Sequence, residues 1–211
     1  MAEGLLTIEQ IASRLGRRQE RGAALLIPLI EAADPERAGR LDILFEVRAS
    51  TLDVQPGEVC LPGGHIERGE TACEAAVREA SEELLVDPGQ ITVLGRLEQV
   101  EGPGGMPLHP FVATLAGYGG TYSSDEVDRV FTLPLDWLLT HKPTLFAVAM
   151  TPTFPDDFPW ERIGGRGYRW RPRPTQTPFY LETDPLVWGA TARVLMRLTE
   201  TLGEARTHGC G

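Results

Sequence analysis

The segment from Gly64 to Val86 reads GHIERGETACEAAVREASEELLV. Its composition from Thr71 to about Leu85 is that of a helix, and Asp87-Pro88-Gly89 form a stop signal directly after it. Apolar residues recur along it at helical spacing, which predicts that one side of the helix packs on another element. These residues are Cys73, Ala76, Val77, Ala80 and Leu84.

Three glutamates occupy the neighbouring arc of the same helix. Each residue of an α-helix advances by about 100° around the axis, so Glu79, Glu82 and Glu83, at i, i+3 and i+4, lie on one side. Carboxylates so close repel one another unless hard cations compensate them, and Mg²⁺ and Mn²⁺ prefer such oxygen ligands. The alternative is a solvated helix face, which is the usual fate of helical glutamates.

The composition is that of a globular protein with one core: 211 residues, 42% hydrophobic and 24% charged. There is no apolar run of the roughly 20 residues that a membrane span needs and no secretory apolar block, so we expect a cytoplasmic protein without a membrane partner. The net charge of −10 argues against a nucleic-acid partner. The three cysteines lack metal-ligand spacing, so neither a disulfide framework nor a zinc site is expected.

Runs of β-favouring residues precede and follow the acidic helix, which predicts several strands. The runs are Ala23–Ile30, Leu41–Val47, Val59–Leu61, Ile91–Val100, His109–Ala116 and Val127–Leu133. Further helices are predicted over Thr7–Gly16, Pro134–Leu139 and Asp184–Leu202, and a long surface loop or hairpin over Thr151–Pro178. This order indicates an α+β fold, an α/β/α sandwich with a mixed β-sheet between helices.

A basic strip contrasts with the acidic chain as a whole. Five arginines lie between Arg162 and Arg173, and no acid follows Glu161 in this stretch. They are Arg162, Arg166, Arg169, Arg171 and Arg173. The strip suggests a small anionic ligand, and the alternative is a solvated charged loop.

The acidic segment also has a fixed spacing: a glycine, five residues, Glu70, seven residues, Arg78-Glu79, two residues and Glu82-Glu83. Position by position it resembles the signature of the Nudix hydrolases, which cut diphosphate linkages with water and a divalent metal. The resemblance implies the Nudix fold and a Mg²⁺- or Mn²⁺-dependent diphosphatase. We expect the Nudix domain to cover residues 23–202, with a helical extension over residues 1–22 before it and a flexible tail over 203–211 after it. Leu85 departs, because the signature has a glycine at this helix exit, and it can shift the helix end.

The resemblance assigns the metal to the acidic helix. Glu79, Glu82 and Glu83 would bind the divalent ion, with Glu82 and Glu83 central to catalysis. The backbone around Gly63 would offer a carbonyl ligand.

Three more residues receive roles from the same resemblance. Arg78 and Glu70 would form a supporting ion pair. Glu126 matches a downstream acid that would act as a metal ligand or as the general base, and the alternative for Glu126 is an exposed loop glutamate.

A second resemblance concerns the substrate. Residues 44–64, LFEVRASTLDVQPGEVCLPGG, are similar to the signature of the coenzyme A pyrophosphatase branch of the Nudix family, and residues 186–192, LVWGATA, to its closing helix. Asp53 stands where that signature has arginine, and Leu61 where it has phenylalanine. The change at Asp53 reverses a charge and can remove a substrate contact.

The coenzyme A branch implies hydrolysis of coenzyme A or acyl-CoA to adenosine 3′,5′-bisphosphate and 4′-phosphopantetheine or its acyl form. Arg48 would hold the diphosphate, unless it is a solvated strand-end residue, and Arg166 and Arg169 would grip the 3′-phosphate. One alternative is a Nudix hydrolase of NADH, ADP-ribose or another nucleoside diphosphate derivative. The other is a non-catalytic nucleotide sensor.

Overall fold

The computed structural model describes residues 20–149, 151–169 and 174–207, with side chains as far as Gly203. The strands in this part of the chain are β1 (Ala23–Glu31), β2 (Leu41–Arg48), β3 (Val59–Cys60), β4 (Gly63–His65), β5 (Ile91–Arg96), β6 (Val100–Glu101), β7 (Pro107–Leu115), β8 (Val127–Pro134), β9 (Thr144–Val148), β10 (Thr175–Tyr180) and β11 (Val187–Trp188). The α-helices are α2 (Ala72–Leu84), α3 (Leu135–Thr140) and α4 (Gly189–Thr207). Short 3₁₀ helices cover Pro35–Arg37, Pro88–Gln90, Pro103–Gly105 and Trp160–Ile163.

The large sheet has eight strands and is mixed, as predicted. Its main order is β3-β2-β1-β7-β5, with β4 paired to β1, β6 to β7 and β8 to β2. The pair β1–β7 is parallel, and the other pairs are antiparallel. β1 and β7 therefore lie next to each other in the interior of the sheet.

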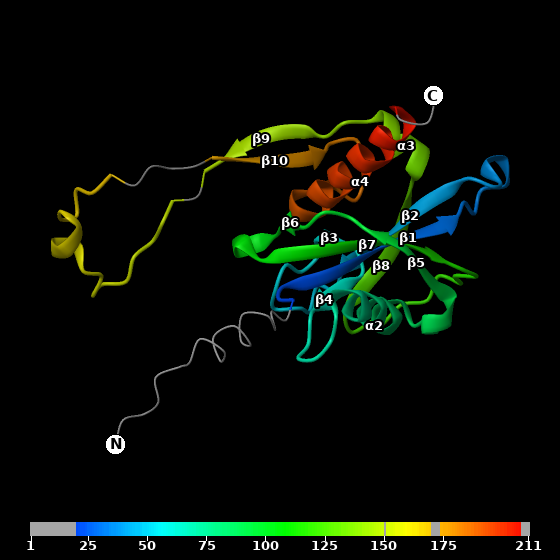
Figure 1. Cartoon of the computed structure of the whole chain (residues 1–211), viewed down its shortest axis with the longest axis horizontal. Helices are drawn as coiled ribbons and strands as arrows, with labels where there is room; N and C mark the ends of the chain where they lie inside the picture. Colours follow the sequence, from blue (N-terminus) through cyan, green and yellow to red (C-terminus); the bar gives the residue numbers. More distant parts are fainter. Residues whose placement is uncertain (1–19, 150, 170–173, 208–211) are drawn as a thin grey trace, which may run out of the picture.

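Helices cover both faces of this sheet (Figure 1), which confirms the predicted α+β sandwich. Adjacent residues of β1 point to opposite faces. Leu26 packs with the alanines of α2, including Ala76 and Ala80. Ile27 belongs to the core on the other face, which contains Leu195 of α4. Because alanine side chains are short, α2 lies close to the sheet, and its acidic edge lies close to the strands.

A second sheet was not predicted. β9, β10 and β11 form three antiparallel strands beside α4. β9 and β10 are the arms of a hairpin whose long connection reaches away from both sheets (Figure 1). The prediction of a loop or hairpin is therefore confirmed, but it missed β9 and assigned most of β10 to the loop.

Two predicted elements have wrong boundaries. The strand expected over Ile91–Val100 is divided into β5, which ends at Arg96, and β6, which begins at Val100, and both strands pair with β7. The helix expected from Asp184 begins only at Gly189. Asp184 and Pro185 lie in a bend, and the pairing of β11 with β10 places Val187 and Trp188 in a strand.

Two further expectations concern the N-terminal helix and the absence of a membrane span. The helix predicted over Thr7–Gly16 lies outside the described residues. Among the helices that the structure does describe, none is both long and apolar enough to cross a bilayer.

A capping box fixes the start of α2. The sequence analysis did not predict it, although its residues are visible in the sequence. The Thr71 hydroxyl accepts from the Glu74 backbone N–H at 3.2 Å, and the Glu74 carboxylate accepts from the Thr71 N–H at 2.9 Å. Glu20 accepts from the N–H of Ala72 at 2.9 Å, so a distant acid also satisfies the first turn.

The end of α2 differs from the expectation for Leu85. The helix is not shifted, because Leu85 itself adopts the left-handed conformation, with φ 53° and ψ 48°, and its N–H donates to Ser81. This conformation costs an L-residue roughly 1–2 kcal/mol. Leu85 is 59% exposed, so little packing offsets that cost.

We predict that Leu85→Gly will raise the free energy of unfolding by about 1 kcal/mol, because glycine adopts this conformation without a Cβ penalty. The measurement is equilibrium unfolding in urea. Leu85→Ala is the matched control, since it removes the exposed side chain but keeps the Cβ. If alanine stabilises as much as glycine, the left-handed conformation at Leu85 is not the source of the effect.

Candidate active site

Two glycines of β4 bring the backbone against the acidic edge of α2. The N–H of Gly63 donates to Oε2 of Glu83 at 2.8 Å. Gly63 has φ 149°, and a Cβ built on it would lie 2.2 Å from the carbonyl oxygen of Ala24. A Cβ on Gly64 would lie 2.4–2.6 Å from the carboxylate of Glu79. Both positions therefore require glycine for this approach of strand and carboxylates.

The loop before β8 closes the other end of the site. The N–H of Ser123 donates to the backbone carbonyl of Glu83 at 2.7 Å, and the hydroxyl of Thr121 donates to that of Leu84 at 2.7 Å. These bonds satisfy carbonyls of the last helical turn. They also hold the loop that carries Glu126 beside α2.

The carboxylates brought together here are difficult to ionise. Burial, with the charges of Glu79 and Glu126, raises the pKa of Glu83 to about 7, although the hydrogen bond from Gly63 lowers it. Burial is also the main cause that raises the pKa of Glu79. A bound cation would reverse these effects, because it stabilises the charged form of each carboxylate.

Arg78 organises the outer side of the acidic helix. Its guanidinium lies 2.9 Å from Glu70, 3.0 Å from Glu79 and 3.3 Å from Glu82. It also donates to the carbonyl of His65 at 3.3 Å. Hydrogen bonding to Arg78 is the main cause that lowers the pKa of Glu70, so this pair is held in its charged form.

Glu82 is the most exposed of the three predicted ligands. Its side chain is 60% exposed and pairs with Arg78, which also pairs with Glu79, whereas Glu83 is turned inward to Gly63. Within the described residues, no three acidic, histidine or cysteine side chains already surround one point as a metal site would. The oxygen donors of Glu79 and Glu83 suit a hard cation, and Glu82 would join them by leaving Arg78.

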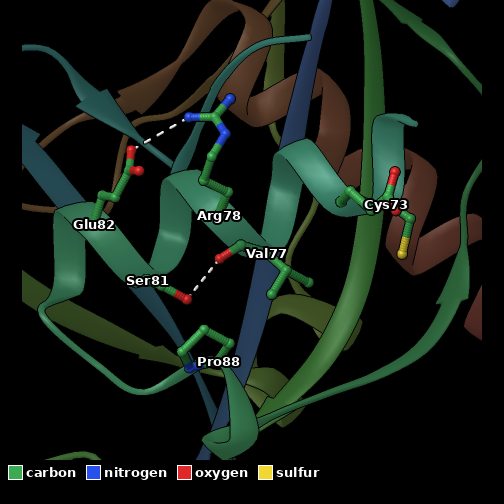
Figure 2. Close-up of a pocket in the computed structure, with 7 residues that line it drawn as sticks. Cys73, Val77, Arg78, Ser81, Glu82 and Pro88 are labelled. Atoms are coloured by element: carbon green, nitrogen blue, oxygen red, sulfur yellow. Dashed lines mark hydrogen bonds and ion pairs between the residues drawn. The ribbon is translucent and has the colours of Figure 1, made fainter. Parts of the chain in front are cut away.

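A shallow groove of about 500 Å³ follows the outward face of α2 (Figure 2). Cys73, Val77 and Pro88 line it, and Arg78 and Glu82 lie at one end. Neither Glu79 nor Glu83 lines this groove. The groove therefore adjoins the acidic cluster without containing it.

Arg48 lies at the end of β2 near the cluster. Its Nε donates to the carbonyl of Val54 at 3.2 Å, and its positive charge lowers the pKa of Glu83. Asp53, in the loop that follows, is exposed. Arg48 is thus placed where it could meet an anion bound at the acidic edge.

The structure does not bring Arg166 and Arg169 to the cluster. Both are exposed in the connection between β9 and β10, which projects away from α2 (Figure 1). The guanidinium of Arg166 lies over the ring of Trp160, 5.9 Å from its centroid. Their binding of a substrate phosphate remains a prediction without support from this geometry.

The sequence analysis missed one acid of the site. Glu46 lies in the middle of β2 and is 0% exposed, and burial, followed by the charge of Glu83, raises its pKa well above the usual range. A lone acid in the apolar run Leu44-Phe45-Glu46-Val47 was a visible signal, since glutamate is rarely buried without a partner.

Comparison with known families places the chain in a class. The model of the NUDIX domain matches residues 33–155. This match includes β2, both glycines of β4, all of α2 and the loop of Glu126. The chain therefore belongs to the Nudix hydrolase family and has the α+β Nudix fold.

Individual relatives are similar over most of the same region. The chain is 32% identical to the peroxisomal coenzyme A diphosphatase NUDT7 of Mus musculus over 140 residues, which are 65% of this chain and 57% of the mouse protein. It is 29% identical to the uncharacterized Nudix hydrolase NudL of Pectobacterium atrosepticum, over 85% of this chain and 82% of that protein. The crystal structure of a Nudix hydrolase from M. smegmatis, RenU, is 27% identical, covering 56% of this chain and 73% of that one, with a TM-score of 0.46.

The two glycines yield a paired prediction. Gly63→Ala should lower the free energy of unfolding by roughly 2–5 kcal/mol, because its Cβ meets rigid backbone at a φ that alanine disfavours. Gly64→Ala should stay folded, because its Cβ meets only the movable end of Glu79. It should instead weaken Mn²⁺ binding at least roughly tenfold by displacing that carboxylate.

Urea unfolding and calorimetric titration with Mn²⁺ separate these two effects. Equal stability loss in both variants, or unchanged Mn²⁺ affinity in Gly64→Ala, would contradict the geometry described for β4 and α2.

Proposed function

We propose that this chain is a metal-dependent Nudix pyrophosphohydrolase that cleaves the diphosphate of coenzyme A or acyl-CoA. The products would be adenosine 3′,5′-bisphosphate and 4′-phosphopantetheine or its acyl form. The observation that carries the proposal is the pair of half-buried and buried carboxylates, Glu79 and Glu83, held against glycine backbone beside Arg48.

The residues of the site divide into ligands and supports. Glu79, Glu82 and Glu83, with the backbone at Gly63, would hold Mg²⁺ or Mn²⁺. Such an ion, when bound, screens the charge of a diphosphate and lowers the pKa of water. Arg78 would release Glu82 to the ion while its bond to Glu70 keeps the guanidinium in place.

The remaining steps fall to other side chains. Arg48 would bind a diphosphate oxygen and orient the phosphorus for attack. Glu126, exposed beside the cluster, would accept a proton from the attacking water. The new P–O bond comes from water, and the bond between that phosphorus and the bridging oxygen breaks. The bridging oxygen leaves with the other phosphate.

Two sequence similarities favour coenzyme A as the substrate. The mouse relative is named a coenzyme A diphosphatase, and residues 44–64 resemble the signature of that branch. Asp53 departs from the signature but is exposed and lies in the loop beyond Arg48.

We predict that Glu83→Gln and Glu82→Gln will each lower kcat at least roughly 100-fold while the protein stays folded, because each removes a charged oxygen ligand. Glu70→Gln should lower kcat less, because it only loosens Arg78. The measurement is the rate of diphosphate hydrolysis at saturating Mg²⁺ or Mn²⁺, with circular dichroism as the control of folding. A loss in Glu70→Gln as large as in Glu83→Gln would contradict this division of roles.

The substrate is tested by comparing coenzyme A, dephospho-coenzyme A, NADH and ADP-ribose with the same enzyme and metal. We predict the highest kcat/KM for coenzyme A, with a preference over the dephospho form of roughly 5- to 150-fold if cationic side chains bind the 3′-phosphate. The double variant Arg166→Ala, Arg169→Ala should then remove most of that preference. Higher activity on NADH or ADP-ribose would reject coenzyme A as the substrate, and an unchanged preference in the double variant would reject a role for these arginines.

A further inference from the structure

The strand β9 is an uncovered edge of the small sheet. The order of this sheet is β11-β10-β9, so β9 pairs with β10 on one side and with no described strand on the other. Every residue of Thr144–Val148 is exposed. In an edge strand, alternate residues turn their N–H and C=O groups away from the sheet, and these groups can pair with another chain.

Other edges of the molecule carry features that discourage such pairing. β5, at one edge of the large sheet, has a register irregularity between Val93 and Gly95 and ends at Arg96. β8, which pairs with β2 alone among the described strands, contains Asp128 and Arg129. The sequence of β9, TLFAV, contains no charge and no proline, and its register against β10 is regular. Because charges and bulges protect edge strands, the unprotected β9 indicates that another chain pairs with it.

An aromatic row crosses the outer face of the same sheet. Tyr180 of β10 belongs to the core that contains Leu195 of α4, so its neighbour Phe179 points to the opposite, outer face. Phe179 stacks on Trp188 of β11 and meets Phe146 of β9 edge to face, each at 5.3 Å between ring centroids. Phe146, at the open edge, is 46% exposed. The row therefore stops where a further strand would continue it.

A second copy of this chain suits the edge because the sequence of β9 is complementary to itself. When two β9 strands pair antiparallel across a two-fold axis at Phe146, Phe146 of one copy faces Phe146 of the other, and Thr144 faces Val148. The two aromatic rows then join into one. Although each chain has a net charge of −10, the pairing places no like charges opposite each other, because β9 is uncharged.

The arm, residues 151–169 of the connection between β9 and β10, enlarges this contact. A stable dimer buries roughly 800 Å² on each partner, which is more than the 5 residues of β9 supply. The arm reaches away from both sheets of its own chain (Figure 1). Because the arm follows the end of β9, antiparallel pairing directs it past the β9 of the other copy and toward the body of that copy.

The composition of the arm suits such a contact. Its second half carries exposed arginines and no acid after Glu161, whereas the chain as a whole has a net charge of −10. Its aromatic rings form a cluster with centroids 4.7–4.8 Å apart, made by Phe154, Phe158 and Trp160. A basic arm with an aromatic cluster is complementary to the acidic surface of a second copy.

We propose that two copies of this chain form a symmetric dimer by antiparallel pairing of their β9 strands, with the arm of each copy lying against the other. The interface is isologous, because the same residues contribute from both sides. The small sheet lies beside α4, across the large sheet from the acidic edge of α2 (Figure 1), so the inference is independent of the proposed function.

Phe146→Lys tests the pairing at its centre. Two lysines would face each other there, and like charges opposite each other in a strand pair are destabilising. Sedimentation velocity of the full chain over a concentration series should show a dimer for the wild type. The dissociation constant of the dimer should rise at least roughly tenfold in Phe146→Lys.

Leu94→Lys is the matched control. It adds the same charge at an exposed apolar residue of another edge strand, β5, and should leave the dissociation constant within about threefold of the wild type. Circular dichroism checks that both variants are folded, which is expected because neither side chain is buried.

A charge exchange tests the register. Phe146→Glu should dissociate the dimer for the same reason as Phe146→Lys. An equimolar mixture of the two variants should form a heterodimer at least roughly tenfold tighter than either homodimer, because residue 146 then faces an opposite charge. Native mass spectrometry distinguishes this heterodimer from the two homodimers by mass.

Three results would overturn the inference. One is a wild type that stays monomeric across the concentration series. The second is a loss of the dimer in Leu94→Lys as large as in Phe146→Lys, and the third is a mixture of the two Phe146 variants that is as monomeric as its components. A wild-type dimer that hydrolyses no diphosphate would reject the proposed function alone and would support the pairing of β9.

Discussion

The bond from the Gly63 N–H to the carboxylate of Glu83 is the contact on which the site depends. It ties a strand of the sheet to the acidic edge of α2 and turns Glu83 inward, away from solvent. The same approach places Glu79 beside Gly64, where no side chain larger than hydrogen fits without displacing it. Because the carboxylates of Glu79 and Glu83 are partly or fully buried against glycine backbone, their charged forms are unfavourable unless a cation binds.

The core makes this arrangement possible. Four alanines of α2, Ala72, Ala75, Ala76 and Ala80, are fully buried against β1 and β7, so the helix approaches the sheet closely. Larger side chains on this face would lift the helix and with it Glu79 and Glu83. The opposite face of β1 belongs to the hydrophobic core that also contains residues of α4. The position of the acids is therefore a consequence of packing as well as of helical period.

Much of this could be predicted from sequence because it depends on local periods. Composition and a stop signal predicted the helix, the spacing of the glutamates predicted its acidic side, and runs of β-favouring residues predicted the strands of the mixed sheet. The period does not fix side-chain torsions, so it could not foresee that Arg78, four residues before Glu82, would hold that carboxylate outward. The buried Glu46 also escaped, because it lies on a strand and Glu83, whose charge raises its pKa, lies on a helix far away in the sequence. The hairpin of β9 and β10 was hard to foresee because Pro178 lies within β10 and a long connection separates the arms.

The central claim is that the acidic edge of α2 binds a divalent cation. The most direct measurement is anomalous diffraction from crystals of the protein grown with Mn²⁺. The account predicts an anomalous peak about 2.1 Å from carboxylate oxygens of both Glu79 and Glu83, with Glu82 turned away from Arg78. An ordered Mn²⁺ ion bound elsewhere, with the Glu83 carboxylate still bonded to the N–H of Gly63 and to no metal, would contradict it.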